Sequence, residues 1–320
     1  MTQFTVITDD FPGSELEFER RFSNQRACQR YLAKMKWPEG FICRKCSHHQ
    51  YWESARKLYI CTRCETPHSL TAGTVMHATK KPLVYWFKDM WWFTTRKSGV
   101  NTANLKELLG LGSYQTAWTW LHKLRGRTIR HGRERLYGCA EVDEFFIGVQ
   151  QPGKRGRGAN GKTIVVAAVE KKGRNKIGRI RLQVVPDCTG DTLEQFVMTD
   201  IEPASQVVTD GWKGYNCLDP ESYEHQQVIA RQESDKASVL PEVHLVASLV
   251  KWIMLGTFQG RFGPEHLQSY MDEYVFRFNR RKSRNIGKKF MRIVQQVVTS
   301  TQTTFRKIVG GVSPFCLLAN

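Results

Sequence analysis

Four cysteines in two tight pairs constrain the fold of this chain more than any other feature. Cys43 and Cys46 form one Cys-x-x-Cys pair, Cys61 and Cys64 form the other, and fourteen residues separate them. Two such pairs supply the four thiolates of a tetrahedral zinc site. The spacing therefore predicts a small zinc ribbon in which zinc is structural, because four thiolates leave no open coordination position.

Two disulfides, an iron–sulfur site or a redox pair are the alternatives to zinc. The chain has nine cysteines, and the five outside the pairs are scattered along the sequence. An odd number of cysteines, most of them not arranged in regularly spaced pairs, argues against a secreted protein held together by disulfides. Four nearby histidines are interpreted as lying outside the ligand set, since the thiolates already close the site: His48, His49, His68 and His77.

The charge of the chain indicates its class of partner. Lysine and arginine number 48 against 30 aspartates and glutamates, which gives a net charge of +18 over 320 residues. This excess favours a polyanion and is hard to reconcile with a small neutral substrate. No run approaches the roughly 18 consecutive apolar residues of a membrane span, and the polar N-terminus lacks a signal pattern. We expect a cytoplasmic, nucleoid-associated protein without a membrane partner.

The sequence divides into four parts of different character. We expect an N-terminal helix and the zinc ribbon over residues 1–80, and a helical segment over 81–132. A domain of strands followed by helices is predicted over 133–285, and a C-terminal tail over 286–320. The predicted fold class is a multidomain protein of the α+β and α/β type.

The helical segment contains a helix-turn-helix pattern. Pro82 opens an aromatic helix that is interpreted as a core helix, and two short helices follow over 102–109 and 113–124 with Gly110-Leu111-Gly112 between them. Helix, glycine turn, helix is typical of DNA-binding hairpins, although such hairpins also occur in protein cores. The second helix is expected to present four residues to bases or phosphates: Tyr114, Gln115, Thr116 and Lys123.

The third part alternates strands and helices in a recognisable order. β-Branched and alternating segments predict strands, and a capped amphipathic segment predicts a helix between the third and fourth strands. The expected strands lie at 136–148, 163–170, 178–185 and 206–209, and the expected helices at 191–201, 243–255 and 264–279. This is the order of a ribonuclease-H-like fold with a mixed sheet covered by helices, in which the first and fourth strands are neighbours.

Two aspartates lie at the ends of those neighbouring strands. Asp143 belongs to the first strand and Asp210 ends the fourth. Their carboxylates can share two Mg²⁺ ions that polarise a phosphodiester and stabilise a leaving oxygen. The alternative is that an acid before a turn is ordinary strand punctuation. Strand alternation places Glu141 on the face of Asp143 and Glu144 on the other.

Positive charge is concentrated in the same part of the chain. A glycine-rich loop carries Lys154, Arg155 and Arg157, and a helix ends at Arg280, Arg281 and Lys282. Such elements can bind phosphates without reading sequence. A basic loop can also be merely solvated, and a basic helix end can serve as a cap.

Taken in order along residues 18–282, these motifs resemble the zinc-ribbon insertion-sequence transposases with a DDE-type domain, the ISXO2-like group. The resemblance is carried by segments 37–46, 69–76, 109–118, 141–144, 154–158, 209–212, 244–256 and 270–281. It implies an RNase-H-like domain that cuts DNA at element ends and joins them to a target. It also implies Mg²⁺ or Mn²⁺ at Asp143 and Asp210, double-stranded DNA as partner, and a homo-oligomer on that DNA.

The resemblance departs from the family pattern at the third metal ligand. His244, Ser248 and Lys251 match the family's helix, so His244 is expected to act in catalysis and Lys251 to hold a phosphate. Leu249, however, stands where the family has an asparagine or an acidic residue, and leucine cannot bind Mg²⁺. The alternative function is therefore a catalytically impaired, transposase-derived DNA-binding protein. Glu273 is a conceivable substitute ligand but is interpreted as structural.

Overall fold

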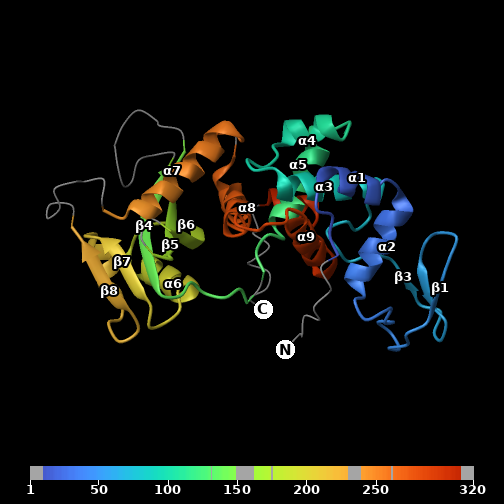
Figure 1. The fold of residues 1–320 in the computed structure, drawn as a ribbon, viewed down its shortest axis with the longest axis horizontal. Coiled ribbons are helices and arrows are strands. Elements are labelled where there is room, and N and C mark those ends of the chain that lie inside the picture. The colour runs from blue at the N-terminus through green and yellow to red at the C-terminus, as the bar shows by residue number, and fades with distance from the viewer. Residues whose placement is uncertain are drawn as a thin grey trace. The chain divides into compact units, whose positions relative to one another are not determined.

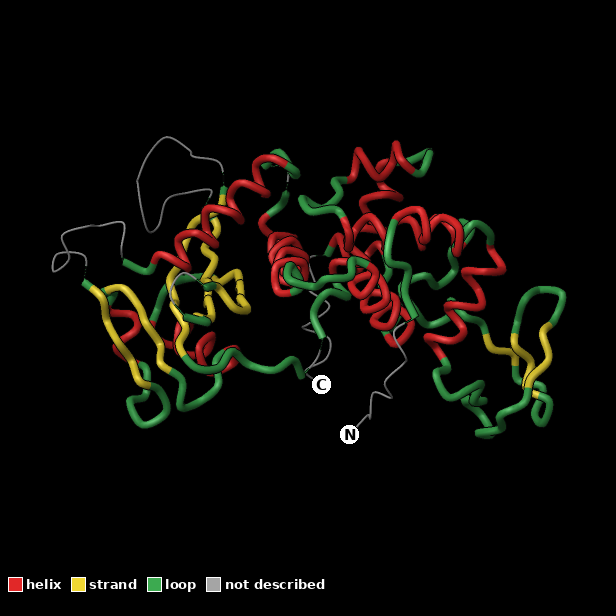
Figure 2. Tube along the Cα trace, viewed as in Figure 1, coloured by secondary structure: helices red, strands yellow, loops and turns green. Residues whose placement is uncertain are grey.

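The computed structural model describes residues 10–130, 132–148, 162–173, 176–229, 239–260 and 262–310. The chain forms two compact units (Figures 1 and 2). Unit 1 combines the residues up to Arg130 with those from Lys282 onward, and unit 2 runs from His131 to Arg281. The division into four domains stays a prediction, although the structure places the ribbon, the helical segment and the C-terminal residues in one unit. Among the described helices, none is long and apolar enough to cross a membrane.

Unit 1 is built mainly from helices around an aromatic core. The helices are α1 (Glu15–Arg21), α2 (Gln25–Lys36), α3 (Leu83–Thr95), α4 (Thr102–Leu108), α5 (Tyr114–Arg125), α9 (Gly287–Thr299) and α10 (Phe305–Val309). Asn24 caps α2 by accepting a hydrogen bond from the Ala27 N–H. The indole of Trp86 in α3 stacks on Trp120 in α5 with centroids 4.0 Å apart. The aromatic helix is thus a core helix, as predicted.

Residues 287–299, which belong to the predicted C-terminal tail, form the helix α9 in the core of unit 1. The fully buried ring of Phe290 packs edge-on against Phe18 and Trp91, with centroids 5.4 and 5.7 Å away. The apolar residues of α9 recur at helical spacing, which makes one face that must be buried. Its buried residues include Phe290, Ile293, Val294, Val297 and Val298.

The cysteine-bearing part of unit 1 is a three-stranded antiparallel sheet. Its strands are β1 (Tyr51–Glu53), β2 (Tyr59–Cys61) and β3 (Pro67–His68), in the order β1-β2-β3. Short strands of this kind bury little apolar surface, so a metal is the usual source of stability. The pairing places Cys61 opposite Tyr51 and leaves Cys64 in the turn before β3.

Unit 2 contains a mixed five-stranded sheet in the order β6-β5-β4-β7-β8 (Figure 1). Its strands are β4 (Cys139–Ile147), β5 (Thr163–Lys171), β6 (Ile177–Val185), β7 (Gln206–Asp210) and β8 (Glu224–Val228). β4 pairs antiparallel with β5 and parallel with β7. The predicted neighbourhood of the first and fourth strands is confirmed. The edge strand β8 was not predicted, because its polar sequence, Glu-His-Gln-Gln-Val, lacks an apolar alternation.

Helices cover both faces of this sheet. α7 (Pro241–Gly256) and α8 (Leu267–Asn279) pack with Phe145, Val165 and Val208 on one face. α6 (Gly190–Asp200) and the 3-10 helix η1 (Lys213–Cys217) pack with Val142 and Val207 on the other. A second 3-10 turn, η3 (Pro264–His266), precedes α8. The result is the predicted mixed sheet between helical layers.

Candidate functional site

The strand register brings Asp143 and Asp210 to adjacent positions. On the parallel pair β4 and β7, Cys139 lies opposite Gln206 and Glu141 lies opposite Val208. Continuing this register by two residues would set Asp143 opposite Asp210, and the pKa of Asp143 is raised by burial and also by the charge of Asp210. Both belong to the face that α7 covers, since Val208 packs under that helix and side chains alternate along a strand. Asp210 ends β7 as predicted, whereas Asp143 lies in the middle of β4 rather than at its end.

The surroundings of Asp143 disfavour a lone negative charge. Burial raises the pKa of Asp143 to about 6, and the charges of Glu144 and Asp210 act in the same direction. The Glu144 N–H donates to Asp143 Oδ1 at 2.8 Å, and His244 also opposes the rise. A buried carboxylate crowded by another is a typical setting for a bound cation, which relieves the repulsion.

His244 reaches the carboxylate pair from α7. Its Nε2 lies 3.1 Å from Asp143 Oδ2, and its side chain is half exposed. The first turn of α7 is fixed to β4, because the Val243 N–H donates to the buried Glu141 Oε2 at 2.9 Å. Lys171 Nζ lies 2.8 Å from the other oxygen of Glu141. Glu141 thus holds α7 in the register that sets His244 over Asp143.

A cavity of about 300 Å³ opens beside these groups. Asp143 lines it from β4, and His244, Ser248 and Lys251 line it from successive turns of α7. Ser248 Oγ donates to the carbonyl of His244 at 2.9 Å. Lys251 Nζ lies 5.6 Å from the ring centroid of Phe145, a cation–π contact that holds the ammonium beside the cavity. The cavity therefore combines a carboxylate, an imidazole, a hydroxyl and an ammonium.

Leu249 lies elsewhere on α7. It is not among the residues that line the cavity beside Asp143. It is 38% exposed and belongs to a solvent-facing apolar row at helical spacing, with Leu245, Trp252 and Leu255. The role of position 249 stays a prediction, and His244 is the residue of α7 that contacts Asp143.

Two further glutamates have structural partners. Glu144 lies on the other face of β4, as predicted, and accepts a hydrogen bond from the buried Tyr215 hydroxyl at 3.1 Å. Glu273 is fully buried and forms an ion pair with Arg277 one turn along α8. It does not line the cavity beside Asp143. The interpretation of Glu273 as structural agrees with this placement.

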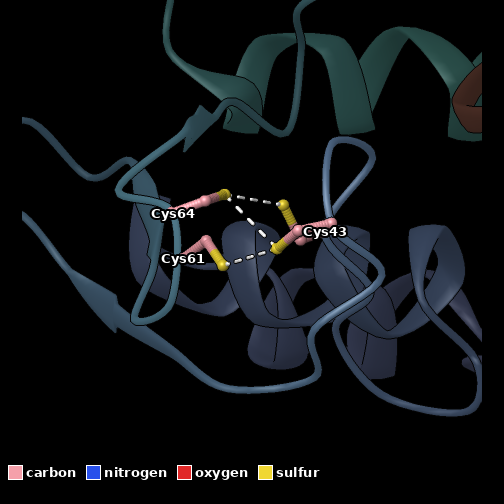
Figure 3. A group of neighbouring side chains, drawn as sticks. Cys43, Cys61 and Cys64 are labelled. Carbon is pink, nitrogen blue, oxygen red and sulfur yellow. Dashed lines mark hydrogen bonds between the residues drawn. The ribbon is translucent and has the colours of Figure 1, made fainter.

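The four cysteines of the ribbon converge on one point (Figure 3). Cys43 Sγ lies 3.5 Å from Cys64 Sγ, and Cys46 Sγ lies 3.6 and 3.4 Å from the sulfurs of Cys61 and Cys64. A tetrahedral zinc with bonds of about 2.3 Å requires sulfur atoms about 3.8 Å apart. The arrangement thus fits a zinc ion, and within the described residues these cysteines are the cluster found with metal-ligand spacing.

Hydrogen-bonding side chains around the four cysteines orient the thiolates. His68 is buried, and its Nε2 lies 3.4 Å from Cys43 Sγ, while Cys64 Sγ lies 3.2 Å from Thr66 Oγ1. Hydrogen-bonding groups around metal ligands fix their orientation. His68 is therefore part of the support of the site rather than a spare surface residue.

Comparison with protein families agrees with this geometry. Residues 135–279 match the ISXO2-like transposase domain, and residues 23–67 match the transposase zinc-ribbon domain. The chain belongs to the ISXO2-like transposase family. The two matched ranges contain Asp143, Asp210 and His244 in one and the four cysteines in the other. No curated protein matches the chain.

The transposase chain presents only some of its predicted DNA-binding residues to solvent. Tyr114 and Gln115 are exposed at the start of α5, and Thr116 is partly exposed. Lys123 differs from the prediction, because its Nζ donates to the Val75 carbonyl at 2.8 Å and lies 5.9 Å from the Trp86 ring. Burial accordingly lowers the pKa of Lys123. Both helices of the predicted helix-turn-helix exist, and its DNA-reading role stays a prediction.

The basic end of α8 is also partly engaged. Arg281 donates to the carbonyls of Ile177, Gly178 and Phe278, and Arg280 donates to the Phe276 carbonyl at 3.1 Å. These contacts cap α8 and tie it to β6, while Lys282 is exposed. The predicted phosphate-binding loop with Lys154, Arg155 and Arg157 lies outside the described residues.

Proposed function

We propose that the protein is the transposase of a bacterial insertion sequence that binds the ends of its element and catalyses metal-dependent DNA cleavage and strand transfer. One arrangement carries the proposal: Asp143 and Asp210 lie on neighbouring parallel strands, and the helix that covers this face presents His244 to Asp143. The family match supports the same reaction class.

The carboxylate pair fits a divalent cation. Asp143 and Asp210 would hold Mg²⁺ or Mn²⁺, for which carboxylates are suitable ligands. When bound, the ion activates the attacking oxygen and stabilises the leaving oxygen of a phosphodiester. The raised pKa of Asp143 is consistent with this assignment, because it arises first from burial and then from the neighbouring charges of Glu144 and Asp210, both of which a bound cation would offset.

His244 takes the place of the third metal-facing residue in this proposal. Its imidazole contacts Asp143 and lines the cavity, whereas Leu249 does neither. Imidazole is a softer ligand than a carboxylate, and it suits Mn²⁺ better than Mg²⁺. Lys251 and Ser248 lie further along the same wall, where the ammonium binds a DNA phosphate by charge and the hydroxyl by hydrogen bonding.

The assignment as a transposase also specifies the partner, the role of the zinc ribbon and the assembly state. Double-stranded DNA is the partner, with the element ends and the target as its two sources, and Tyr114, Gln115 and Thr116 contact it. The zinc ribbon is a structural module. Two DNA ends must be held together for transfer, so the active form is a homo-oligomer on DNA. A catalytically impaired DNA-binding protein is the alternative, and activity decides between them.

The test is a cleavage and joining assay on labelled DNA that carries the ends flanking the gene. The full-length protein should act with Mg²⁺ or Mn²⁺, while Asp143→Asn and Asp210→Asn should abolish cleavage and retain DNA binding. Asp219→Asn, an exposed aspartate of the same unit, is the matched control and should cleave normally. Unchanged cleavage by either active-site variant contradicts the metal assignment. Binding without cleavage by the parent protein supports the impaired alternative.

A further inference from the structure

The zinc ribbon borders a second cavity that the catalytic assignment does not use. It has a volume of about 280 Å³ and lies between the end of α2, the first cysteine pair and the segment after β3. Three cationic side chains line it, namely Lys36, Arg44 and Lys45, and no acidic residue is among its lining residues. A concave site with one sign of charge focuses the field and attracts the opposite charge.

Lys36 is the deepest of the three cations. Its ammonium donates to the carbonyls of Ser69 at 2.7 Å and Leu70 at 3.0 Å. Burial lowers the pKa of Lys36 to about 8, and the charge of Arg44 acts in the same direction. An ammonium has three N–H donors, and these carbonyls take two of them. An anion in the cavity would relieve the repulsion between Lys36 and Arg44.

The wall of the cavity is held by the metal site. His68 and Thr66 line the cavity, and they contact the sulfurs of Cys43 and Cys64. Arg44 and Lys45 lie between Cys43 and Cys46, so both cations are set in position by the knuckle that carries two thiolates. A site with fixed walls binds with a smaller entropic cost than a flexible surface.

The zinc site beside the cavity also contributes negative charge. A zinc ion with four thiolates carries a formal charge of −2, and three cations exceed it. The cavity is too small for a base pair and open enough for a protruding backbone group. We propose that this cavity binds a backbone phosphate of DNA, with Arg44 and Lys45 as the contacting cations and Lys36 as the buried charge behind them. The inference rests on the proposed DNA-binding function.

Arg44→Gln tests the proposal, with Arg63→Gln as its matched control. Both arginines are exposed residues inside a Cys-x-x-Cys knuckle of the same ribbon, and only Arg44 lines the cavity. We expect Arg44→Gln to weaken duplex binding at low salt and to reduce the slope of log K against log salt by about 1, the value for one lost phosphate contact. Arg63→Gln should leave the slope unchanged, and zinc content should be equal in all three proteins.

Three results would overturn the proposal. Equal weakening by both variants would indicate diffuse surface charge, and loss of zinc in Arg44→Gln would mean that the cations serve the metal site. Unchanged duplex binding by Arg44→Gln, together with binding of millimolar inorganic phosphate by the parent protein and not by that variant, would assign the cavity to free phosphate. DNA binding by the parent protein without cleavage would instead contradict the catalytic proposal and leave this one standing.

Discussion

His244 Nε2 and Asp143 Oδ2 lie 3.1 Å apart, although 101 positions separate the two residues in the chain. The contact depends on Glu141, which accepts the Val243 N–H and so fixes where α7 begins on β4. The rotation of α7 about its own axis on the sheet therefore determines which side chain faces Asp143. The position of a residue within the sequence motif does not.

Substitutions of His244 and Leu249 should have opposite consequences. His244→Ala removes the imidazole beside Asp143, so metal-dependent cleavage should fall by about 10-fold or more. Leu249→Ala is the control on the same helix, and it should cleave like the parent protein because Leu249 faces solvent. Both rates should be measured at saturating DNA in Mn²⁺. A loss in Leu249→Ala with full activity in His244→Ala would restore residue 249 as the important position.

Metal preference provides a second test of His244. His244→Glu replaces an imidazole by a carboxylate, a ligand that suits Mg²⁺ better. The ratio of cleavage in Mg²⁺ to cleavage in Mn²⁺ should therefore rise relative to the parent protein. Titration of Mn²⁺ binding by paramagnetic resonance should show weaker binding in His244→Ala, independently of activity. An unchanged ratio together with unchanged Mn²⁺ binding would place His244 outside the metal site.

The cysteine cluster and the neighbourhood of the first and fourth strands could be predicted from the sequence, because both follow from local spacing and strand order. The contact between His244 and Asp143 could not be derived from local spacing, and His244 was expected at the site only through the family resemblance. Leu249 follows His244 by five residues, which on an α-helix is a rotation of about 140° from the same direction. The hydrogen bond between Glu141 and Val243 and the buried apolar face of α7 together determine which side of the helix meets the sheet.

Other differences have the same origin in tertiary contacts. Lys123 is expected from the helix-turn-helix pattern to face DNA, yet its ammonium donates to the Val75 carbonyl. Arg281 was expected to bind phosphates, yet three backbone carbonyls accept its N–H groups. Long cationic side chains can reach such distant partners. Residues 287–299 carried a clear apolar period that could have predicted α9.

Removal of zinc should unfold the ribbon and weaken DNA binding. Four thiolates within reach of one another repel when ionised unless a cation joins them, so folding of β1 to β3 is coupled to the metal. A strong chelator should abolish ribbon structure in amide exchange, and Cys46→Ser should do the same without chelator. Cys217→Ser changes an exposed thiol outside the ribbon and should retain zinc. A metal analysis that finds no zinc in the parent protein would refute this assignment.

The packing of α9 should contribute strongly to the stability of unit 1. Phe290 is fully buried against rings from three other helices, so Phe290→Ala should lower the free energy of unfolding by about 3–5 kcal/mol. Phe305→Ala, at a partly exposed position in α10, should cost much less. Denaturant unfolding of both variants measures the difference. Equal small losses would mean that α9 is not part of the cooperative core.

Unit 2 should lose stability in acid through Glu170. This buried carboxylate accepts the Arg179 N–H at 2.9 Å and forms ion pairs with Arg179 and Lys172 at 3.1 and 3.2 Å. Burial alone would raise its pKa, but the hydrogen bonds from Arg179 and Lys172 outweigh it and lower the pKa to about 2. Because the pKa is lower in the folded than in the unfolded state, the stabilisation is present at neutral pH. It disappears as the pH falls from about 4.5 toward 2.

Glu170→Gln should therefore reduce the free energy of unfolding at pH 7 by on the order of 2 kcal/mol. The difference from the parent protein should shrink as the pH falls from about 4.5 toward 2, since the unfolded parent protein then binds a proton that folded Glu170 accepts only near pH 2. Glu221→Gln, an exposed glutamate of the same unit, should match the parent protein throughout. Urea unfolding at pH 7, 5, 4 and 3 gives the comparison. A difference that is independent of pH would assign the loss to packing and not to the charge of Glu170.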